Sequence, residues 1–225
     1  TFDVSILQIG QDIFEVLATA GDTYLGGDDF DERIVDWATE QFQAQYQLSS
    51  NLELESMLRL REAAELAKIE LTDNETTWIQ LPELHQTPDG QVLDLEVELT
   101  RPIFNQMVMD LVQRTFKVCD EAMQEAKVTS SEIDGVILVG GPTRLPIIRN
   151  SVRHYFQREP NVDVAPDLVV AMGAAIQADA LLDESTSTFL LDVTPQTLRI
   201  GTVTDFTEPI IERNTAIPID RTRTF

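Results

Sequence analysis

The sequence predicts a fold of the α/β class, and three observations support this. Apolar and polar residues alternate over residues 1–9, which is typical of a strand with one buried face. Several longer segments carry apolar residues at helical spacing. A short apolar run at 136–139 ends in Gly140-Gly141, after which Pro146 opens a helix. Strands that alternate with helices in this way are typical of α/β proteins.

The first hundred residues are predicted to form four strands and two helices. Glycine turns separate the early elements, first at Gly10 and then at Gly26-Gly27. The acidic residues that follow Gly27 suit the positive end of a helix. The predicted elements are strands at 1–9 and 12–20, a helix of about twenty residues starting near Asp28, a helix at 52–71, and strands at 76–82 and 92–99 around a turn at 87–90.

The second half is predicted to begin with a long helix that Thr100 caps. Its apolar face is formed by residues at helical spacing, namely Phe104, Val108, Leu111, Thr115, Val118 and Ala122. A buried strand is predicted at 136–139, and two further helices complete the globular part near Leu182. The polar stretch at 183–188 is the best candidate for a domain boundary, and strand-like runs follow at 189–193 and 196–203.

The composition argues against several classes of protein. Sixteen basic and thirty-nine acidic residues give a net charge of −23, which disfavours nucleic acid as a partner. No apolar run approaches the length that crosses a bilayer, so no role in a membrane is expected. The single cysteine, Cys119, cannot form an internal disulfide and is predicted to lie in the core. His85 and His154 are isolated, so no zinc site is predicted.

Two groups of polar residues could serve a nucleotide, although each has a simpler explanation. Thr1 and Asp3 point to the same face of the first strand, and a hydroxyl beside a carboxylate suits a magnesium–phosphate site. Such a pair is more often an ordinary polar strand face. Glu65, Lys68 and Thr72 share one helical face, and by spacing alone they form a solvated salt bridge beside a hydroxyl.

The glycine turn at Gly140-Gly141 offers a different kind of site. Bare backbone N–H groups between a strand and a helix N-terminus can bind an anion. Two glycines alone are also compatible with an ordinary turn between a strand and a helix. The motifs that surround this turn decide between the two interpretations.

Seven blocks of sequence, taken in order, closely resemble the second half of the ATPase domain of the seventy-kilodalton heat-shock (DnaK-type) chaperones. They are TFDVS (1–5), TAGDTYLGGDDFD (19–31), EAAELAKIEL (62–71), GVILVGGPTRLP (135–146), APDLVVAMGAAIQ (165–177), LLDVTP (190–195) and IERNTAIP (211–218). The resemblance is colinear over essentially the whole chain. It implies the second lobe of an actin-like (ribonuclease-H-like) ATPase domain, with a small inserted α+β subdomain and a short C-terminal β extension.

The resemblance also implies how the chain is divided. The lobe would occupy 1–183, with a larger subdomain at 1–25 and 104–183 and a smaller one inserted at 26–103; an interdomain linker would follow at 184–195, and the start of a β substrate-binding domain at 196–225. Because the first residues already belong to a strand, we expect the chain to be an excised piece that another lobe precedes.

The cofactors that the resemblance implies are ATP or ADP and Mg²⁺. Thr1 would lie near the γ-phosphate, and Asp3 would face the metal through water, so both are expected to act in catalysis. Glu65 and Lys68 match residues that bind ribose. Thr72 stands where a serine commonly reaches adenine.

The remaining implied nucleotide contacts lie in glycine-containing segments and in the residues that follow them. Gly27 is one of them, and Gly140 and Gly141 match the loop that approaches the adenosine and its α-phosphate. Arg144 resembles the arginine that packs on the adenine face, a role that suits a planar guanidinium. Asp167 matches a residue near the nucleotide cleft.

Two positions depart from the family pattern. Ile69 stands where animal cytosolic members carry an arginine against the base, and isoleucine there is typical of bacterial members. Pro142 replaces a serine found in many relatives, which removes one possible hydroxyl contact. The glycines that normally surround the first phosphate loop lie before Thr1 in the family.

The function that the resemblance implies is that of a cytoplasmic stress-response chaperone, which couples ATP binding and hydrolysis to the binding and release of unfolded polypeptides. A J-domain co-chaperone and a nucleotide-exchange factor would be its partners. The alternatives are another actin-like ATPase, of the sugar kinase or filament-forming class, and a non-hydrolysing chaperone-like protein. Because phosphoryl transfer in this fold needs two lobes, we expect the isolated chain to be inactive.

Overall fold

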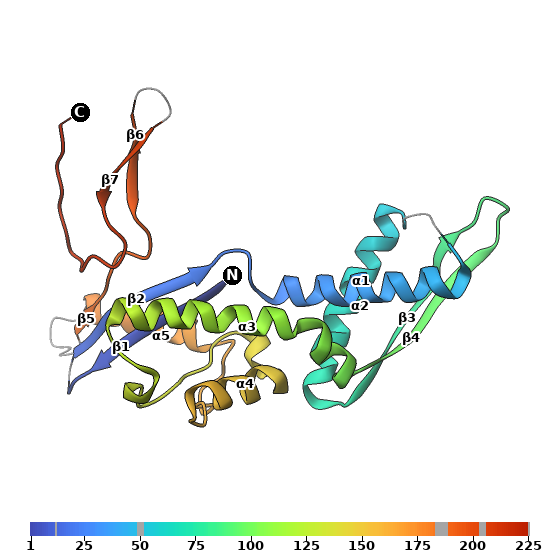
Figure 1. The fold of residues 1–225 in the computed structure, drawn as a ribbon, viewed down its shortest axis with the longest axis horizontal. Helices are drawn as coiled ribbons and strands as arrows, with labels where there is room; N and C mark the ends of the chain where they lie inside the picture. Colours follow the sequence, from blue (N-terminus) through green and yellow to red (C-terminus); the bar gives the residue numbers. More distant parts are fainter. Residues whose placement is uncertain (12, 49–51, 183–188, 203–205, 225) are drawn as a thin grey trace.

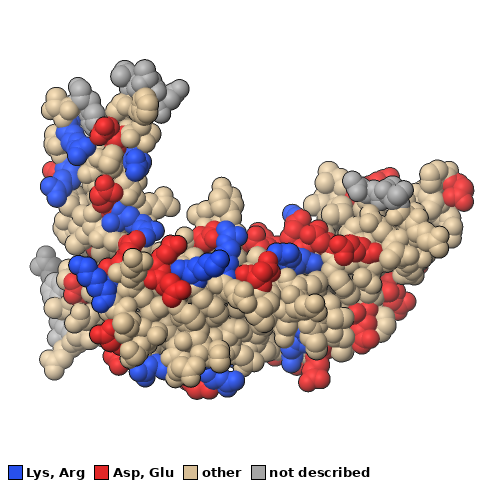
Figure 2. All heavy atoms as spheres, in the orientation of Figure 1, with Lys and Arg blue, Asp and Glu red and all other residues tan. Residues whose placement is uncertain are grey.

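The computed structural model describes residues 1–11, 13–48, 52–182, 189–202 and 206–224. Figure 1 shows an elongated molecule in which a long helix, α3 (Arg101–Ala126), runs along the middle. The hairpin of β3 (Thr76–Gln86) and β4 (Val92–Thr100) projects at one end, and the hairpin of β6 (Leu198–Gly201) and β7 (Thr207–Ile211) projects at the other. Acidic side chains are spread along the whole visible face with basic ones among them (Figure 2).

A three-stranded sheet lies at the end of the molecule that carries β6 and β7. Its first strand, β1 (Phe2–Ile9), runs antiparallel to β2 (Ile13–Asp22). The short strand β5 (Phe189–Leu191) adds to the other edge of β2 in parallel, so the sheet order is β1-β2-β5. The strands predicted at 1–9 and 12–20 are confirmed, except that residue 12 lies outside the described part of the chain.

The other end of the molecule is built from α1 (Gly27–Tyr46), α2 (Leu54–Asp73) and the β3–β4 hairpin. The sequence predicts all four elements, and the turn between the strands closes at the predicted place, where the Gly90 N–H donates to the carbonyl of Thr87. The α1 helix begins with acidic residues, and the Asp29 carboxylate accepts a bond from the Gly26 N–H. Buried side chains between these elements include those of Phe30, Phe42, Leu60, Leu71 and Leu99.

The α3 helix contributes to two apolar cores. Thr100 caps it as predicted, by accepting a bond from the Ile103 N–H. Of the predicted apolar face, Phe104, Val108, Leu111, Val118 and Ala122 are buried. The first three of these pack with α1 and α2, whereas the last two pack with residues of β1 and β2. A single helix therefore connects the packing at the two ends of the molecule.

The predicted buried strand at 136–139 is wrong. This segment makes one isolated bridge, from Ile137 to Asn161, and the side chain of Ile137 is 61% exposed. A buried strand needs a paired neighbour and cover on its faces, and in the described residues only the segment at Asn161 pairs with it. The turn that follows does form, as a 3₁₀ helix at Gly141–Arg144, and α4 (Pro146–Phe156) begins at Pro146 as predicted.

The last elements return to the sheet. The α5 helix (Val169–Leu182) ends where the sequence predicts but has no buried residue, and the predicted boundary at 183–188 lies outside the described residues. Beyond β5, Val193 bridges Ala216, so the segment after β7 lies close to the strand. No described helix is both long and apolar enough to cross a membrane. The division into subdomains, linker and β domain remains a prediction.

Candidate functional site

Thr1 and Asp3 lie side by side at the start of β1, as their spacing predicts. The Thr1 hydroxyl donates to the Asp3 carboxylate at 3.1 Å, and both residues are exposed. Two glycines approach the pair closely: a Cβ atom at Gly21 would lie 2.6 Å from Oδ1 of Asp3, and one at Gly26 would lie 2.7 Å from the backbone nitrogen of Thr1. Gly26 therefore leaves no room for a side chain beside the backbone, whereas a side chain at Gly21 would displace the Asp3 carboxylate.

Lys68 reaches the same region from α2. Its side chain is buried, and its ammonium donates to the Asp31 carboxylate on α1 at 2.8 Å and to the carbonyl of Gly27 at 3.3 Å. A Cβ atom at Gly27 would lie 3.4 Å from Nζ of Lys68 and 3.3 Å from Cγ of Pro142. The absence of a side chain at Gly27 thus lets the ammonium of Lys68 and the ring of Pro142 approach the same backbone closely.

Asp31 is a carboxylate of the site that the sequence does not predict. With its acidic neighbours, its position in the sequence indicates only a favourable charge at a helix N-terminus. The signal that could have found it is its place on the buried face of α1, with Ile34, Val35 and Ala38 at helical spacing. Burial raises the pKa of Asp31 above its usual value, while the hydrogen bond and charge of Lys68 act in the opposite direction.

The loop that begins at Gly140 approaches Gly27 through Pro142. Gly140 has a φ of 93°, in the left-handed region that favours glycine. Its N–H donates to the carbonyl of Pro166 at 2.8 Å, which ties this loop to the segment that carries Asp167. A Cβ atom at Gly140 or Gly141 would meet no atom within 4 Å, so this face of the loop is open to a ligand.

Arg144 and Asp167 form an ion pair next to this loop. The Nη2 and Nε atoms of Arg144 donate to Oδ1 of Asp167 at 2.5 and 3.2 Å. This contact lowers the pKa of Asp167 below its usual value. The Arg144 side chain is 46% exposed, which leaves room for a planar group to stack on the guanidinium.

A cavity of about 500 Å³ lies beside this ion pair. It brings together Thr72, Arg144 and Asp167, three residues predicted to contact the nucleotide from separate segments of the chain. Its lining is completed by Ile69, Asp73, Pro146, Arg149 and Asn150. Arg149 and Asn150 were not predicted, because nothing in their helical spacing distinguishes them from ordinary surface residues of α4.

The predicted site residues form one strip across the molecule. It starts at Thr1 and Asp3, passes Gly26-Gly27 and Lys68, and crosses to Pro142 before it reaches the cavity. Glu65 is exposed on α2 and lies close enough to Asp31 to raise the pKa of that carboxyl further. The roles of these residues toward a ligand remain predictions.

The end of the strip at Asp3 fits a magnesium ion held through water. Within the described ranges no group of three or more His, Cys, Asp or Glu side chains is placed to bind a metal. Mg²⁺ commonly keeps several waters and takes further ligands from phosphates, so one carboxylate beside a hydroxyl suffices. Asp3 and Thr1 provide this donor set.

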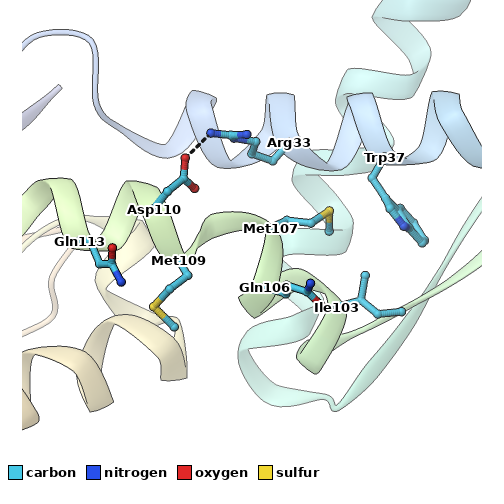
Figure 3. Close-up of a pocket in the computed structure, with 8 residues that line it drawn as sticks. All are labelled: Arg33, Trp37, Ile103, Gln106, Met107, Met109, Asp110 and Gln113. Atoms are coloured by element: carbon cyan, nitrogen blue, oxygen red, sulfur yellow. Dashed lines mark hydrogen bonds and ion pairs between the residues drawn. The ribbon is translucent and has the colours of Figure 1, made fainter.

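A larger cavity, of about 720 Å³, lies between α1 and α3 and does not contain the predicted residues. Figure 3 shows Arg33 on α1 bonded to Asp110 on α3, with Met107 between the two helices and Trp37 facing Ile103. Its two charged side chains already neutralise each other. We therefore place the candidate site at the strip from Thr1 to Asp167.

The chain is similar to known proteins over its whole length. The family model described as Hsp70 protein matches residues 1–225. Proteins named chaperone protein DnaK are 44% identical to it in Thermotoga petrophila and Thermotoga maritima and 47% identical in Thermosipho melanesiensis, in each case over 229 aligned residues and 100% of the chain. The chain spans 38% of the length of these relatives.

Proposed function

Because the chain belongs to the Hsp70 family, we propose that it is part of an ATP-dependent molecular chaperone. Residues 1–183 would form the second lobe of its actin-like ATPase domain, 184–195 its interdomain linker and 196–225 the start of its β substrate-binding domain. One observation carries the proposal: residues from separate segments line up in the order of the parts of a nucleotide, from base to terminal phosphate.

The nucleoside would occupy the cavity end of the strip. Arg144 would stack on adenine while Asp167 holds its guanidinium in place, and Thr72 would reach the edge of the base. Lys68 and Glu65, about one and two helical turns before Thr72, would bind the ribose hydroxyls. The Lys68 ammonium would donate to the ribose and the Glu65 carboxylate would accept from it, and a hydrogen bond to a charged group is worth about 1.5–3 kcal/mol.

The phosphates would lie along the glycine segments. The open face of the Gly140-Gly141 loop, whose Gly140 N–H is already bonded to the carbonyl of Pro166, would approach the α-phosphate, and the phosphates would continue past Gly27 toward Thr1. At the far end Thr1 would contact the γ-phosphate. Mg²⁺, facing Asp3 through water, would neutralise part of the phosphate charge.

Hydrolysis would depend on both lobes of the ATPase domain. Phosphoryl transfer is accelerated by positioning and by charge stabilisation on all sides of the reacting phosphate. Thr1 and Asp3 provide these on one side only, so the isolated chain would bind nucleotide weakly and turn it over at no useful rate.

The three-stranded sheet would couple nucleotide state to substrate binding. β5, which holds Leu190 and Leu191, is paired with β2, and β2 precedes Gly26-Gly27 by only a few residues. Closure around ATP would favour this pairing, and release of β5 after hydrolysis would free the β domain. Unfolded polypeptides, a J-domain co-chaperone and a nucleotide-exchange factor would be the partners, in the cytoplasm.

The proposal is tested on the full-length protein with a fluorescent unfolded peptide. ATP, unlike ADP, is expected to accelerate peptide release, and Thr1→Ala is expected to slow hydrolysis at least tenfold while ATP still binds. Ser5→Ala is the matched control, because this hydroxyl is exposed on the same face of β1 but four residues after Thr1. A full-length protein that bound neither ATP nor peptide would show that the proposed function is wrong.

A further inference from the structure

The buried ion pair of Lys68 and Asp31 has no explanation in the contacts assigned so far. The side chains are only 10% and 9% exposed, and the two residues lie on different helices, α2 and α1. Removing two charges from water is costly, and such a pair often stabilises a fold no better than apolar residues of the same size. A pair of this kind is therefore better explained by what it positions.

The contacts of the Lys68 ammonium indicate that this ammonium is the group that the ion pair positions. An ammonium carries three donors, of which one serves Asp31 and one serves the carbonyl of Gly27. The ammonium packs against Gly27, which also lies against Cγ of Pro142. Asp31 and the Gly27 carbonyl thus hold Nζ from within the protein, beside two residues of the candidate strip, and its third donor remains for a ligand.

A flexible lysine without such a partner would point into solvent. Its side chain has four rotatable bonds and about 2 kcal/mol of rotamer entropy, so an unrestrained ammonium is a weak recognition element. Asp31 removes this freedom before a ligand arrives, which is how preorganisation increases affinity. The exposed Glu65, one turn earlier on α2, has no comparable restraint among the described contacts.

We propose that Asp31 is a positioning residue of the nucleotide site: it holds the Lys68 ammonium beside Gly27, where it hydrogen-bonds the ribose hydroxyls, and so sets the preference for nucleotides that carry both hydroxyls. The inference rests on the proposed function. A site built to hydrogen-bond a hydroxyl rejects the analogue that lacks it, because its own buried polar group is then left unpaired.

The competing explanation is that the pair only ties α1 to α2. The chain offers a matched control for this, since Glu32, the next residue on α1, forms an ion pair with Arg61 of α2 at 2.5 Å. That pair is exposed, and neither residue lines the strip. A structural role would make both pairs affect stability without changing which nucleotide is preferred.

The experiment measures the affinities of the full-length protein for ATP, 2′-deoxyATP and 3′-deoxyATP by titration calorimetry. The wild-type protein is expected to prefer ATP over at least one deoxy analogue by tenfold or more. Asp31→Asn is expected to reduce this ratio of affinities at least fivefold, mainly by weakening the binding of ATP. Glu32→Gln is expected to leave the ratio unchanged. Thermal melting of each variant verifies that it is folded.

The outcomes separate this inference from the function on which it rests. A wild-type protein that binds no nucleotide contradicts the proposed function, whereas one that binds ATP and both deoxy analogues equally contradicts the role of Asp31 alone. A folded Asp31→Asn variant that keeps the wild-type ratio overturns the inference as well. If that variant does not fold, the double variant Asp31→Asn with Lys68→Gln removes both buried charges. The inference requires that this variant no longer prefers ATP over the deoxy analogues, and a preference equal to that of the wild type overturns it.

Discussion

Arg213, in the segment after β7, forms an ion pair with Glu125 near the end of α3. Asn214 donates to the same carboxylate, and its side-chain oxygen accepts a bond from the Thr19 N–H of β2 at 2.9 Å. The C-terminal segment is therefore connected to both the sheet and the central helix. Ala216 of the same segment bridges Val193, two residues after β5, so this contact supports the position of that strand.

The first prediction concerns this ion pair. Glu125→Gln is expected to weaken docking of the C-terminal segment and to reduce the ATP-induced acceleration of peptide release about two- to fivefold, because a partly exposed pair contributes about 1 kcal/mol or less. Stopped-flow peptide release by the full-length protein measures this. Exchange of the two charges, Glu125→Arg with Arg213→Glu, should restore much of the ATP-induced acceleration of peptide release. Glu208→Gln is the control, since the Glu208–Arg223 pair lies within the C-terminal segment; an equal loss in this variant would contradict the prediction.

The second prediction concerns the pairing of β5 with β2. Leu190 and Leu191 are opposite Phe14 and Glu15, and replacing both leucines with Asp would place two carboxylates beside Glu15 at the sheet edge. We expect ATP to lose its effect on peptide release in this variant, while ATP still binds. Leu198→Asp, an exposed leucine of β6 that does not pair with β2, serves as the control. Normal acceleration of release in the double variant would mean that the strand is not the coupling element.

The third prediction concerns the nucleoside end of the strip. In the full-length protein, Lys68→Ala and Arg144→Ala are each expected to weaken ATP binding at least several-fold, because a lost contact to a charged group costs about 1.5–3 kcal/mol. Titration calorimetry measures this, with melting curves for Lys68→Ala, since that change leaves Asp31 buried without its partner. Arg153→Ala removes an exposed pair elsewhere on α4 and should not alter affinity. Unchanged affinity in both site variants would falsify the assignment.

The fourth prediction concerns Cys119, a buried residue of α3. Burial raises the pKa of its thiol from 9.0 to about 11. The unfolded thiol therefore loses its proton at lower pH than the folded one, so the free energy of unfolding should fall as the pH rises from about 9 to 11, by at most about 1.4 kcal/mol per pH unit. Urea unfolding of the wild type and of Cys119→Ala, compared at several pH values, isolates this contribution, because the variant lacks the thiol.

The same burial makes Cys119 unreactive in the folded protein at pH 8. A thiol reagent is expected to modify it only at the rate at which the surrounding core opens. Fast modification in the native state, without denaturant, would show that this part of the core is accessible.

Much of the fold follows from local patterns in the sequence. The helical spacing of apolar residues from Phe104 to Ala122 predicts the buried face of α3, and Thr100 predicts its first residue. The same holds for the hairpin turn at 87–90, because turn chemistry depends on neighbouring residues only. These elements form because residues that are close in the sequence satisfy one another's hydrogen bonds.

Only part of the candidate site could be predicted from the sequence. Spacing places Thr1 beside Asp3 and puts Lys68 on one face of α2, and the resemblance to a family suggests why. Neither could show that Asp31 and Lys68 meet, since this contact depends on how α1 and α2 pack and not on either helix alone. An acid on an apolar helix face is the one local sign of such a buried partner.

What the sequence by itself determined is therefore the set of elements, their caps and turns, and the family of the chain. What only the tertiary structure decided is which elements become neighbours: β5 pairs with β2 across more than half of the chain, and the run at 136–139 has a strand's composition but makes only one bridge. The physical reason is that helices and turns satisfy their hydrogen bonds locally, whereas a strand acquires its structure from a partner that the local sequence does not specify.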